Sequence, residues 1–157
     1  MPSNTRSRVL CVDNDEDACE MLRALLTSYQ FDATCVQSVA EAWLLIKAER
    51  FDLYLLDGWL PRVDGFELCR QLREFDSDTP IVFYSGAAYD ADKQRGIAAG
   101  ANAYVTKPDL EGLIEIMVDL IAKGKADAVA RGWVNKPSPP AEKWLAAPFF
   151  SVETASD

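Results

Sequence analysis

Short apolar runs alternate with segments of helical period from residue 8 to about residue 123, and this alternation constrains the fold more than any other feature of the sequence. A chain that repeats a strand and a helix in this way builds a parallel sheet covered by helices. Runs with strand character lie at residues 9–12, 33–36, 53–56, 81–84 and 103–105. The central runs are continuously apolar, which is typical of strands buried on both faces. The pattern therefore predicts an α/β domain with helices on both sides of the sheet.

Each predicted strand is followed by a predicted helix. In the first and the last helix, apolar residues recur at the spacing of one helical face: residues 18, 21, 22, 25, 26 and 29, and residues 110, 113, 114, 117 and 121. Ser38 and Glu41 form a capping box for the second helix. The third helix opens at Asp64-Gly65 and turns three apolar residues inward: Phe66, Cys69 and Leu72. The fourth, near residues 90–99, is Ala-rich and only weakly amphipathic.

Apolar runs and cysteine spacing indicate the cellular compartment of the protein. No apolar run approaches the roughly 20 residues that a membrane span needs, and the polar N-terminus lacks the apolar stretch of a signal peptide. We therefore expect a cytoplasmic protein with no membrane partner. Four cysteines occur without a Cys-x-x-Cys pair, at Cys11, Cys19, Cys35 and Cys69. We expect buried reduced thiols there, and neither a zinc site nor a disulfide framework.

Charge and histidine content exclude several functions. The net charge is −9 and no Lys/Arg cluster stands out in the sequence, which argues against nucleic acid as a direct partner. The sequence contains no histidine, so Ser-His-Asp catalysis, Cys-His catalysis and histidine metal ligands are excluded. Any histidine chemistry must come from another molecule.

Polar residues follow four of the five predicted strands. In a doubly wound parallel sheet, ligands bind outside the carboxyl ends of the strands. The residues at these ends are Asp13-Asn14-Asp15, Asp57, Ser85-Gly86 and Thr106-Lys107-Pro108. Any one of these residues alone would be ordinary at the end of a strand, because Asp and Asn favour turns and helix caps. Together they predict a site where two carboxylates, a hydroxyl and an ammonium group converge.

Such a site suits phosphate chemistry. Clustered carboxylates hold Mg²⁺ together with waters and phosphate oxygens. Asp57 could attack phosphorus and form an acyl phosphate, while the cation and Lys107 neutralise the equatorial oxygens and Ser85 hydrogen-bonds one of them. Positioning and electrostatics would do most of the catalysis, so no general base is required.

The segments VLCVDND, DLYLLDGWLPRVDGFEL, IVFYSGA and GANAYVTKP carry these residues. In order, strand context and spacing they resemble the chemotaxis-regulator-like receiver domains of two-component response regulators, over about residues 8–123. The resemblance implies a flavodoxin-like fold: a doubly wound, five-stranded parallel sheet with strand order 2-1-3-4-5 and five helices. The stretch after residue 123 is too short and too weakly periodic for a helix-turn-helix effector, so we expect a stand-alone receiver without a separate effector domain. The expected parts are a leader at 1–7, the receiver domain at 8–123, and a helix extension with a Pro- and aromatic-containing tail at 124–157.

The resemblance also assigns roles. Asp57 would be the phosphoacceptor, and Mg²⁺ would be held by Asp57, Asp13, Asn14 and the backbone carbonyl of Trp59. Ser85 and Lys107 would grip the phosphoryl group. Ser85 and Tyr104 would form the switch, in which the aromatic ring turns inward when the hydroxyl moves toward the phosphoryl group. The Lys107-Pro108 bond would be a cis peptide, which is inexpensive only before proline.

The partner implied by the resemblance is a sensor histidine kinase or a histidine phosphotransfer protein. The signal would pass through protein contacts to an unidentified target, and a homodimer is compatible with this mode. The protein would act as a switch with slow self-dephosphorylation at most, and not as an enzyme. Four aromatic residues of the 132–157 tail are expected to dock on the parent domain or on a partner: Trp133, Trp144, Phe149 and Phe150.

Two residues depart from the family pattern. Asn14 stands where a second carboxylate is usual, and its amide oxygen can ligate a cation but brings no charge, so we expect weakened Mg²⁺ binding. Trp59 places a large ring two residues after the phosphoacceptor. We expect it to shield an acyl phosphate from water and to lengthen the life of the phosphorylated form.

Two other functions fit the sequence less well. The first is a receiver-like interaction module that works without phosphorylation, in which Asn14 would reflect loss of the metal-binding chemistry. This hypothesis predicts no Mg²⁺-dependent modification by acetyl phosphate. A haloacid-dehalogenase-type phosphatase would use Asp13 and Asp15 in a D-x-D arrangement after the first strand. That reaction leaves Asp57 without a role.

Overall fold

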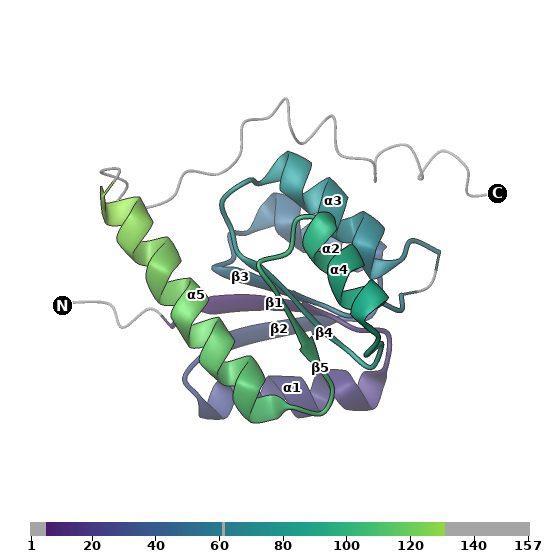
Figure 1. Cartoon of the computed structure of the whole chain (residues 1–157). Coiled ribbons are helices and arrows are strands. Elements are labelled where there is room, and N and C mark those ends of the chain that lie inside the picture. The colour runs from purple at the N-terminus through teal and green to yellow at the C-terminus, as the bar shows by residue number, and fades with distance from the viewer. Residues whose placement is uncertain (1–5, 61, 131–157) are drawn as a thin grey trace.

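Five parallel strands form one sheet in the computed structural model, which describes residues 6–60 and 62–130. The strands are β1 (Arg8–Val12), β2 (Asp32–Val36), β3 (Leu53–Leu56), β4 (Ile81–Ser85) and β5 (Ala103–Thr106). Their order is β2-β1-β3-β4-β5, so the chain steps from β1 to one side and then continues on the other side of β1 (Figure 1). The predicted doubly wound sheet with order 2-1-3-4-5 is confirmed.

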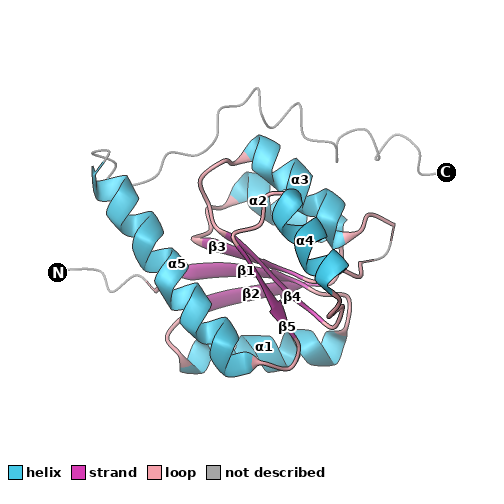
Figure 2. Ribbon diagram, viewed as in Figure 1, coloured by secondary structure: helices cyan, strands magenta, loops and turns pink. Residues whose placement is uncertain are grey.

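Helices cover both faces of this sheet. On one face lie α1 (Glu16–Ser28) and α5 (Leu110–Ala130), and on the other lie α2 (Val39–Ala48), α3 (Gly65–Phe75) and α4 (Asp90–Ala98) (Figure 2). All five predicted helices are present, including the weakly marked fourth. α5 continues without a break to Ala130. The docking expected of the tail concerns residues outside those that the structure describes.

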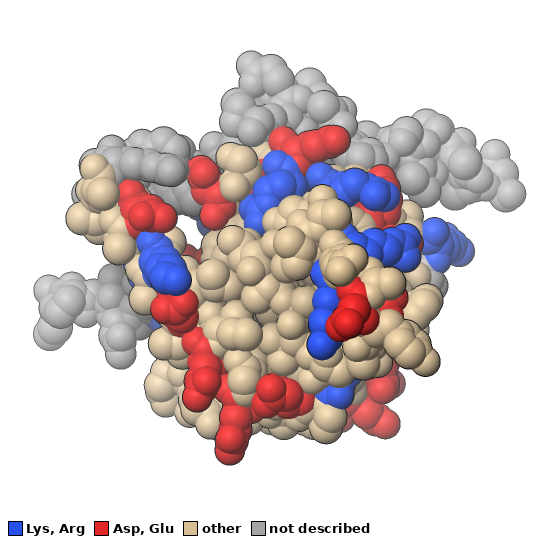
Figure 3. Space-filling model, in the orientation of Figure 1, with Lys and Arg blue, Asp and Glu red and all other residues tan. Residues whose placement is uncertain are grey.

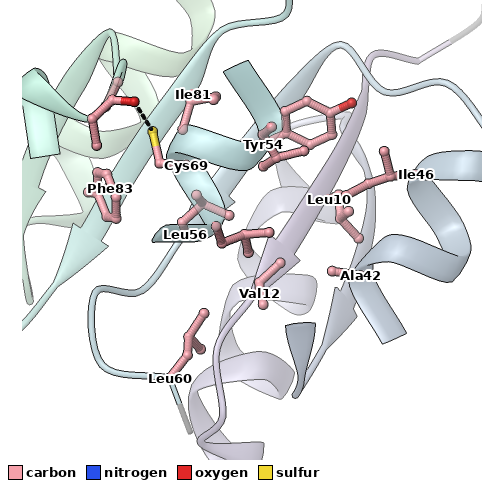
Figure 4. Close-up of a cluster of buried hydrophobic side chains, with 14 of the residues drawn as sticks. Leu10, Val12, Ala42, Ile46, Tyr54, Leu56, Leu60, Cys69, Ile81 and Phe83 are labelled. Carbon is pink, nitrogen blue, oxygen red and sulfur yellow. Dashed lines mark hydrogen bonds between the residues drawn. The ribbon is translucent and has the colours of Figure 1, made fainter. Parts of the chain in front are cut away.

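The strands feed two hydrophobic cores because successive strand residues point to opposite faces. One core, under α2, α3 and α4, takes residues such as Leu10, Leu56 and Phe83 (Figure 4). The other, under α1 and α5, takes their neighbours, such as Cys11 and Leu55. This division explains why the strand sequences are continuously apolar.

Side-chain caps start four of the helices, and at α5 the cap is Asp109, which accepts the Gly112 N–H at 2.9 Å. Ser38 accepts the Glu41 N–H at 3.2 Å and the Glu41 carboxylate accepts the Gln37 N–H at 3.1 Å, which makes a reciprocal cap for α2. Asp15 and Asp64 accept N–H groups from the first turns of α1 and α3. At α4, by contrast, the N-cap residue makes no side-chain hydrogen bond. The weak sequence signal of α4 therefore corresponds to a helix without a side-chain cap.

The remaining global expectations concern thiols and membranes. The four cysteines are free, and three are buried while Cys35 is only half-buried, which corrects the expectation that all four are enclosed. Among residues 6–60 and 62–130, no helix combines the length and apolar character needed to cross a bilayer.

Lys and Arg gather over α3 and α4, and Asp and Glu lie along α5 and α1 (Figure 3). Several of these arginines already have partners within the domain. Arg73 donates to the carbonyls of Thr79 and Gly100, Arg70 pairs with Glu67, and Arg95 pairs with Asp64. These three arginines therefore make contacts within the domain, and the Arg95–Asp64 pair joins α4 to the start of α3.

Candidate functional site

Backbone hydrogen bonds carry the parallel ladder beyond the strands and fix the first three site residues. The Asp13 N–H donates to the Val36 carbonyl at 3.0 Å, and the Asp57 N–H donates to the Val12 carbonyl at 3.0 Å. On the other side of the sheet, the Lys107 N–H donates to the Ser85 carbonyl at 2.9 Å. The strand order changes direction between β1 and β3, because β2 lies on one side of β1 and β3 lies on the other. Ligands bind at this point in doubly wound sheets.

The side chains of Asp13, Asp57 and Lys107 meet at this edge. Lys107 Nζ lies 2.7 Å from Asp13 Oδ2 and 3.6 Å from Asp57 Oδ2. Asp13 and Asp57 are buried, with 3% and 7% of their surface exposed, and the Lys107 side chain is 27% exposed. Two buried carboxylates thus face one partly exposed ammonium group. The convergence expected from the strand ends is present for these three residues.

Burial and the opposite charges at the site shift the pKa values of Asp57 and Lys107. Burial raises the pKa of Asp57, and the Lys107 charge and the Trp59 N–H lower it by less. For Lys107, burial acts to lower the pKa, but the hydrogen bond to Asp13 and the charges of Asp57 and Asp13 outweigh it and raise the pKa. The ammonium form of Lys107 is therefore held firmly, while Asp57 stays a poorly solvated carboxyl group.

Ser85 lies near both Asp57 and Tyr104. Its side chain is fully buried, and its Oγ accepts the Ala87 N–H at 3.3 Å. Burial has the largest influence on the pKa of Asp57 and raises it, and the nearby Ser85 hydroxyl acts in the opposite direction. The same hydroxyl lowers the pKa of Tyr104, which burial raises overall. Ser85 thus stands between the carboxylate and the tyrosine.

The Tyr104 ring is half-buried and lies inward against β4. It stacks on Phe83 with ring centroids 5.5 Å apart, and Phe83 stacks in turn on Phe66 at 5.0 Å. The Tyr104 hydroxyl donates to the Ala87 carbonyl at 2.7 Å. The orientation of this ring is therefore tied both to an aromatic stack and to the loop after β4.

Asn14 and Trp59 lie at the exposed margin of the site. Asn14 is exposed, beside the buried Asp13. The Trp59 N–H donates to Asp57 Oδ1 at 3.2 Å, but its ring is 63% exposed. The Lys107-Pro108 peptide is cis. Within the described residues, no group of three or more His, Cys, Asp or Glu side chains gathers as a metal site, so a cation here would rely on two carboxylates and neutral oxygens.

Two supporting residues escaped the sequence analysis. A Cβ on Gly65 would lie far inside van der Waals contact of the Asp57 carbonyl oxygen, so only glycine lets α3 start this close to the Asp57 backbone. The Cys19 thiol donates to the Asp13 carbonyl at 3.1 Å. Gly65 had a signal, since an Asp-Gly pair opens a helix shortly after Asp57. No sequence signal marked the role of Cys19, because a cysteine at an inward position of a helix is indistinguishable from an ordinary core residue.

The comparisons decide the family. Residues 9–118 match the family model of the response regulator receiver domain. The chain belongs to this receiver domain family. Response regulator MprA of Mycolicibacterium vanbaalenii is 36% identical over 121 residues, which are 76% of this chain and 52% of that protein. MprA of Mycobacterium leprae is 34% identical, over 78% of this chain and 54% of that protein. The receiver domain therefore spans about half the length of the curated relatives it matches.

Solved structures agree with this membership. The receiver domain of a Francisella response regulator superposes with a TM-score of 0.71 at 26% identity, over 75% of this chain and 98% of that one. The receiver domain of a sensor histidine kinase from Pseudomonas aeruginosa gives a TM-score of 0.69 at 26% identity, over 75% of this chain and 99% of that one. The Pseudomonas structure has a magnesium ion coordinated in its active site cleft.

Proposed function

We propose that this receiver domain accepts a phosphoryl group on Asp57 from the phosphohistidine of a sensor histidine kinase or a histidine phosphotransfer protein, and that it signals through protein contacts. The observation that carries the proposal is the meeting of Asp57, Asp13 and Lys107 Nζ at the carboxyl edge of β1 and β3. Receiver domains are phosphoacceptors, and the geometry fits that chemistry.

The transfer follows from the charges at this edge. An Asp57 carboxylate oxygen attacks phosphorus, the P–N bond to the partner's imidazole breaks, and its electron pair stays on that nitrogen. Lys107 Nζ, 3.6 Å from Asp57 Oδ2, neutralises charge on the phosphoryl oxygens. The Ser85 hydroxyl donates to one of them. Slow hydrolysis of the acyl phosphate would return Asp57 to its free form, so the domain acts as a switch.

The residues present also fit a magnesium ion. The Asp13 and Asp57 carboxylates, the Asn14 amide oxygen and the Trp59 carbonyl would hold it, since Mg²⁺ prefers oxygen ligands and commonly takes one or two carboxylates. The bound ion supplies positive charge beside the phosphoryl oxygens. The magnesium in the Pseudomonas receiver structure supports the same use here. Asn14 brings no charge, and we propose that it weakens the affinity for the ion.

Several finer assignments belong to this proposal. Ser85 and Tyr104 form the switch pair, residues 8–123 form the receiver domain, and residues 124–157 add the helix extension and tail. The partners are proteins in the cytoplasm, with neither nucleic acid nor membrane among them. The family match over residues 9–118 supports the bounds of the receiver domain, and the net charge of −9 argues against nucleic acid.

Intact-mass spectrometry after incubation with acetyl phosphate tests the proposal. We expect the wild type to gain one phosphate-sized adduct with Mg²⁺ and none without it. Asp57→Asn should gain no adduct, whereas the matched variant Asp15→Asn should behave like the wild type, because the Asp15 side chain is exposed and only caps α1. Absence of the adduct on the wild type, with a competent receiver domain modified in parallel, would refute the phosphoacceptor function and favour a module that works without phosphorylation. Loss of the adduct in Asp15→Asn would instead favour the D-x-D chemistry of a phosphatase.

A further inference from the structure

Gly96 is the one buried residue of α4, and it faces two aromatic rings. A Cβ added at this position would lie 2.8 Å from Tyr104 Cδ2 and 3.0 Å from Phe83 Cδ2. Carbon atoms do not approach so closely without displacement, since contacts between them are optimal near 3.5–4.0 Å. The backbone of α4 can therefore rest on these rings only because residue 96 has no side chain.

The two rings differ in their freedom to move. Phe83 is fully buried and is held between Phe66 and Tyr104 in the aromatic stack. Tyr104 is half-buried, and its hydroxyl is held by one hydrogen bond to the Ala87 carbonyl. Crowding at residue 96 is therefore relieved most easily by turning the Tyr104 ring outward.

The helix itself is restrained beside this contact. The Arg95 guanidinium lies over the Phe66 ring, 4.4 Å from its centroid, and Arg95 Nη2 lies 2.8 Å from Asp64 Oδ2 at the start of α3. The Cys69 thiol of α3 also donates to the Ala99 carbonyl at 3.6 Å, the dashed contact in Figure 4. These links hold α4 against α3, so a lift of the whole helix would break several contacts at once.

We propose that Gly96 is a positioning residue that lets α4 pack on the inward Tyr104 ring and so biases the switch toward its inward form. The proposal rests on the proposed function, in which Ser85 and Tyr104 form the switch pair that responds to Asp57; Ser85 Oγ and the Tyr104 hydroxyl both bond to the backbone of Ala87. Coupling between two sites is reciprocal, so a phosphoryl group that favours the inward ring is itself favoured when the ring is inward. A residue that biases the ring inward therefore also favours the phosphorylated state, by at most the free energy of that bias.

The first test uses the free protein and needs no phosphorylation. In NMR spectra of the full chain, we expect nuclear Overhauser contacts between the Gly96 α-protons and the Tyr104 ring, and between the rings of Tyr104 and Phe83. In Gly96→Ala the contact between the Tyr104 and Phe83 rings should weaken severalfold, while that between Phe66 and Phe83 persists. A wild type without the Gly96 contact, or a variant that retains the full contact between Tyr104 and Phe83, would overturn the proposal.

A matched control separates this effect from helix propensity. Gly124 is also helical, in α5, and a Cβ there would meet nothing within 4 Å. Gly124→Ala should raise the thermal midpoint and leave the Tyr104 signals unchanged, whereas Gly96→Ala should lower the midpoint. If Gly96→Ala fails to fold, the double variant Gly96→Ala/Tyr104→Ala should fold, because removal of the ring makes room for the methyl group. A double variant that also fails would contradict the proposal.

The second test measures the coupling to Asp57. With Mg²⁺ and beryllium fluoride as a phosphoryl analogue, Gly96→Ala should bind the analogue about fivefold more weakly than the wild type, a typical size for coupling between sites. Equal affinity in a variant whose Tyr104 ring has turned outward would overturn the coupling. If even the wild type does not bind the analogue, the proposed phosphoacceptor function fails, and the NMR contacts of the free protein still decide the role of Gly96.

Discussion

The neighbouring helices α3 and α4 are attached to the same sheet in different ways. α3 begins with an Asp64 cap and buries six of its residues, among them Phe66 and Leu72. α4 begins at Tyr89 without a side-chain cap and buries only Gly96. Most of the free energy that holds a helix in a protein comes from its buried apolar face. α3 therefore belongs to a firmly held frame formed by this helix and the strands it covers, and α4 is the less firmly attached of the two helices, despite its contacts with α3.

This difference matches the division of labour at the site. Asp13 and Asp57 follow β1 and β3, and α3 starts directly on the Asp57 backbone at Gly65. Ser85 and Tyr104 belong to β4 and β5, which flank α4. The carboxylates of the proposed chemistry thus lie beside the firmly held helix α3, and the proposed switch pair lies beside the lightly held helix α4. Elements that move in switching are drawn from the least stable parts of a fold.

The largest expected effect comes from core truncations in the two helices. Leu72→Ala in α3 removes a fully buried side chain and should lower the free energy of unfolding by about 2–5 kcal/mol. Ile97→Ala in α4 removes a side chain that is 50% exposed, so the loss should be under about 1 kcal/mol, partly offset by the better helix propensity of alanine. Urea denaturation of both variants measures the two values. Equal losses would break the comparison.

The helix starts should differ in the same direction. Asp64 accepts the Glu67 N–H at 2.8 Å and pairs with Arg95, so Asp64→Ala should cost about 1–2 kcal/mol. Asp64→Asn keeps a capping side chain and should recover most of that loss. Tyr89→Ala should change stability by less than about 0.5 kcal/mol, because the Tyr89 side chain is 82% exposed and caps nothing. A Tyr89 effect as large as that of Asp64 would show that α4 is held more firmly than its contacts indicate.

Much of the frame could be predicted from the sequence. The alternation of apolar runs and helical segments gave the five strands, and Phe66, Cys69 and Leu72 are buried in α3 as their spacing predicts. Order along the chain placed Asp13, Asp57 and Lys107 at one edge, because parallel strands bring their carboxyl ends together. These predictions succeeded because each depends on a strong local period or on topology.

The lightly held half was harder to predict. The approach of Gly96 to Tyr104 depends on how α4 is rotated about its axis, and a helix with almost no apolar face carries no periodic signal of that rotation. The pairing of Arg95 with Asp64 joins two helices across the chain and has no local pattern. The exposed ring of Trp59 depends on a loop conformation, which hydrophobic spacing does not specify.

The frame should also show a pH effect that stems from Asp57. Burial raises the pKa of Asp57 in the folded protein above the ordinary value of an aspartate, about 3.9. Its stability contribution is then fully present below that ordinary value and is lost as the pH rises through the folded pKa. We expect Asp57→Asn to be more stable than the wild type at pH 7, with the advantage shrinking as the pH falls through the acid range. Urea midpoints from pH 3 to pH 7 measure it, and a constant difference would contradict the assignment.

Asn14 has no negative charge, and this should weaken Mg²⁺ binding beside Asp13 at the end of β1. Asn14→Asp adds a carboxylate beside Asp13 and should tighten Mg²⁺ binding by roughly tenfold, since ligand charge tunes affinity for hard cations. Titration with Mg²⁺, followed by tryptophan fluorescence, gives both dissociation constants. Wild-type affinity equal to or tighter than that of Asn14→Asp would refute the weakening.

The smallest effect is expected at Trp59. If its ring folds over the acyl phosphate, Trp59→Ala should shorten the half-life of phosphorylated Asp57 by roughly two- to fivefold, within 1 kcal/mol of barrier height. Decay of the adduct after removal of acetyl phosphate measures the half-life. Because the ring is 63% exposed in the free protein, an unchanged half-life would mean that the ring stays in solvent after phosphorylation as well.

Hydrogen exchange with and without phosphorylation tests the central claim most directly, namely that Asp57 chemistry acts on α4 while α3 stays fixed. Wild type and Asp57→Asn are each treated with Mg²⁺ and acetyl phosphate, and amide exchange is followed by mass spectrometry in Gly65–Phe75 and Asp90–Ala98. The account predicts that exchange in α4 changes on phosphorylation of the wild type, that exchange in α3 does not, and that Asp57→Asn shows neither change. Equal changes in both helices, or the same change in Asp57→Asn, would contradict it.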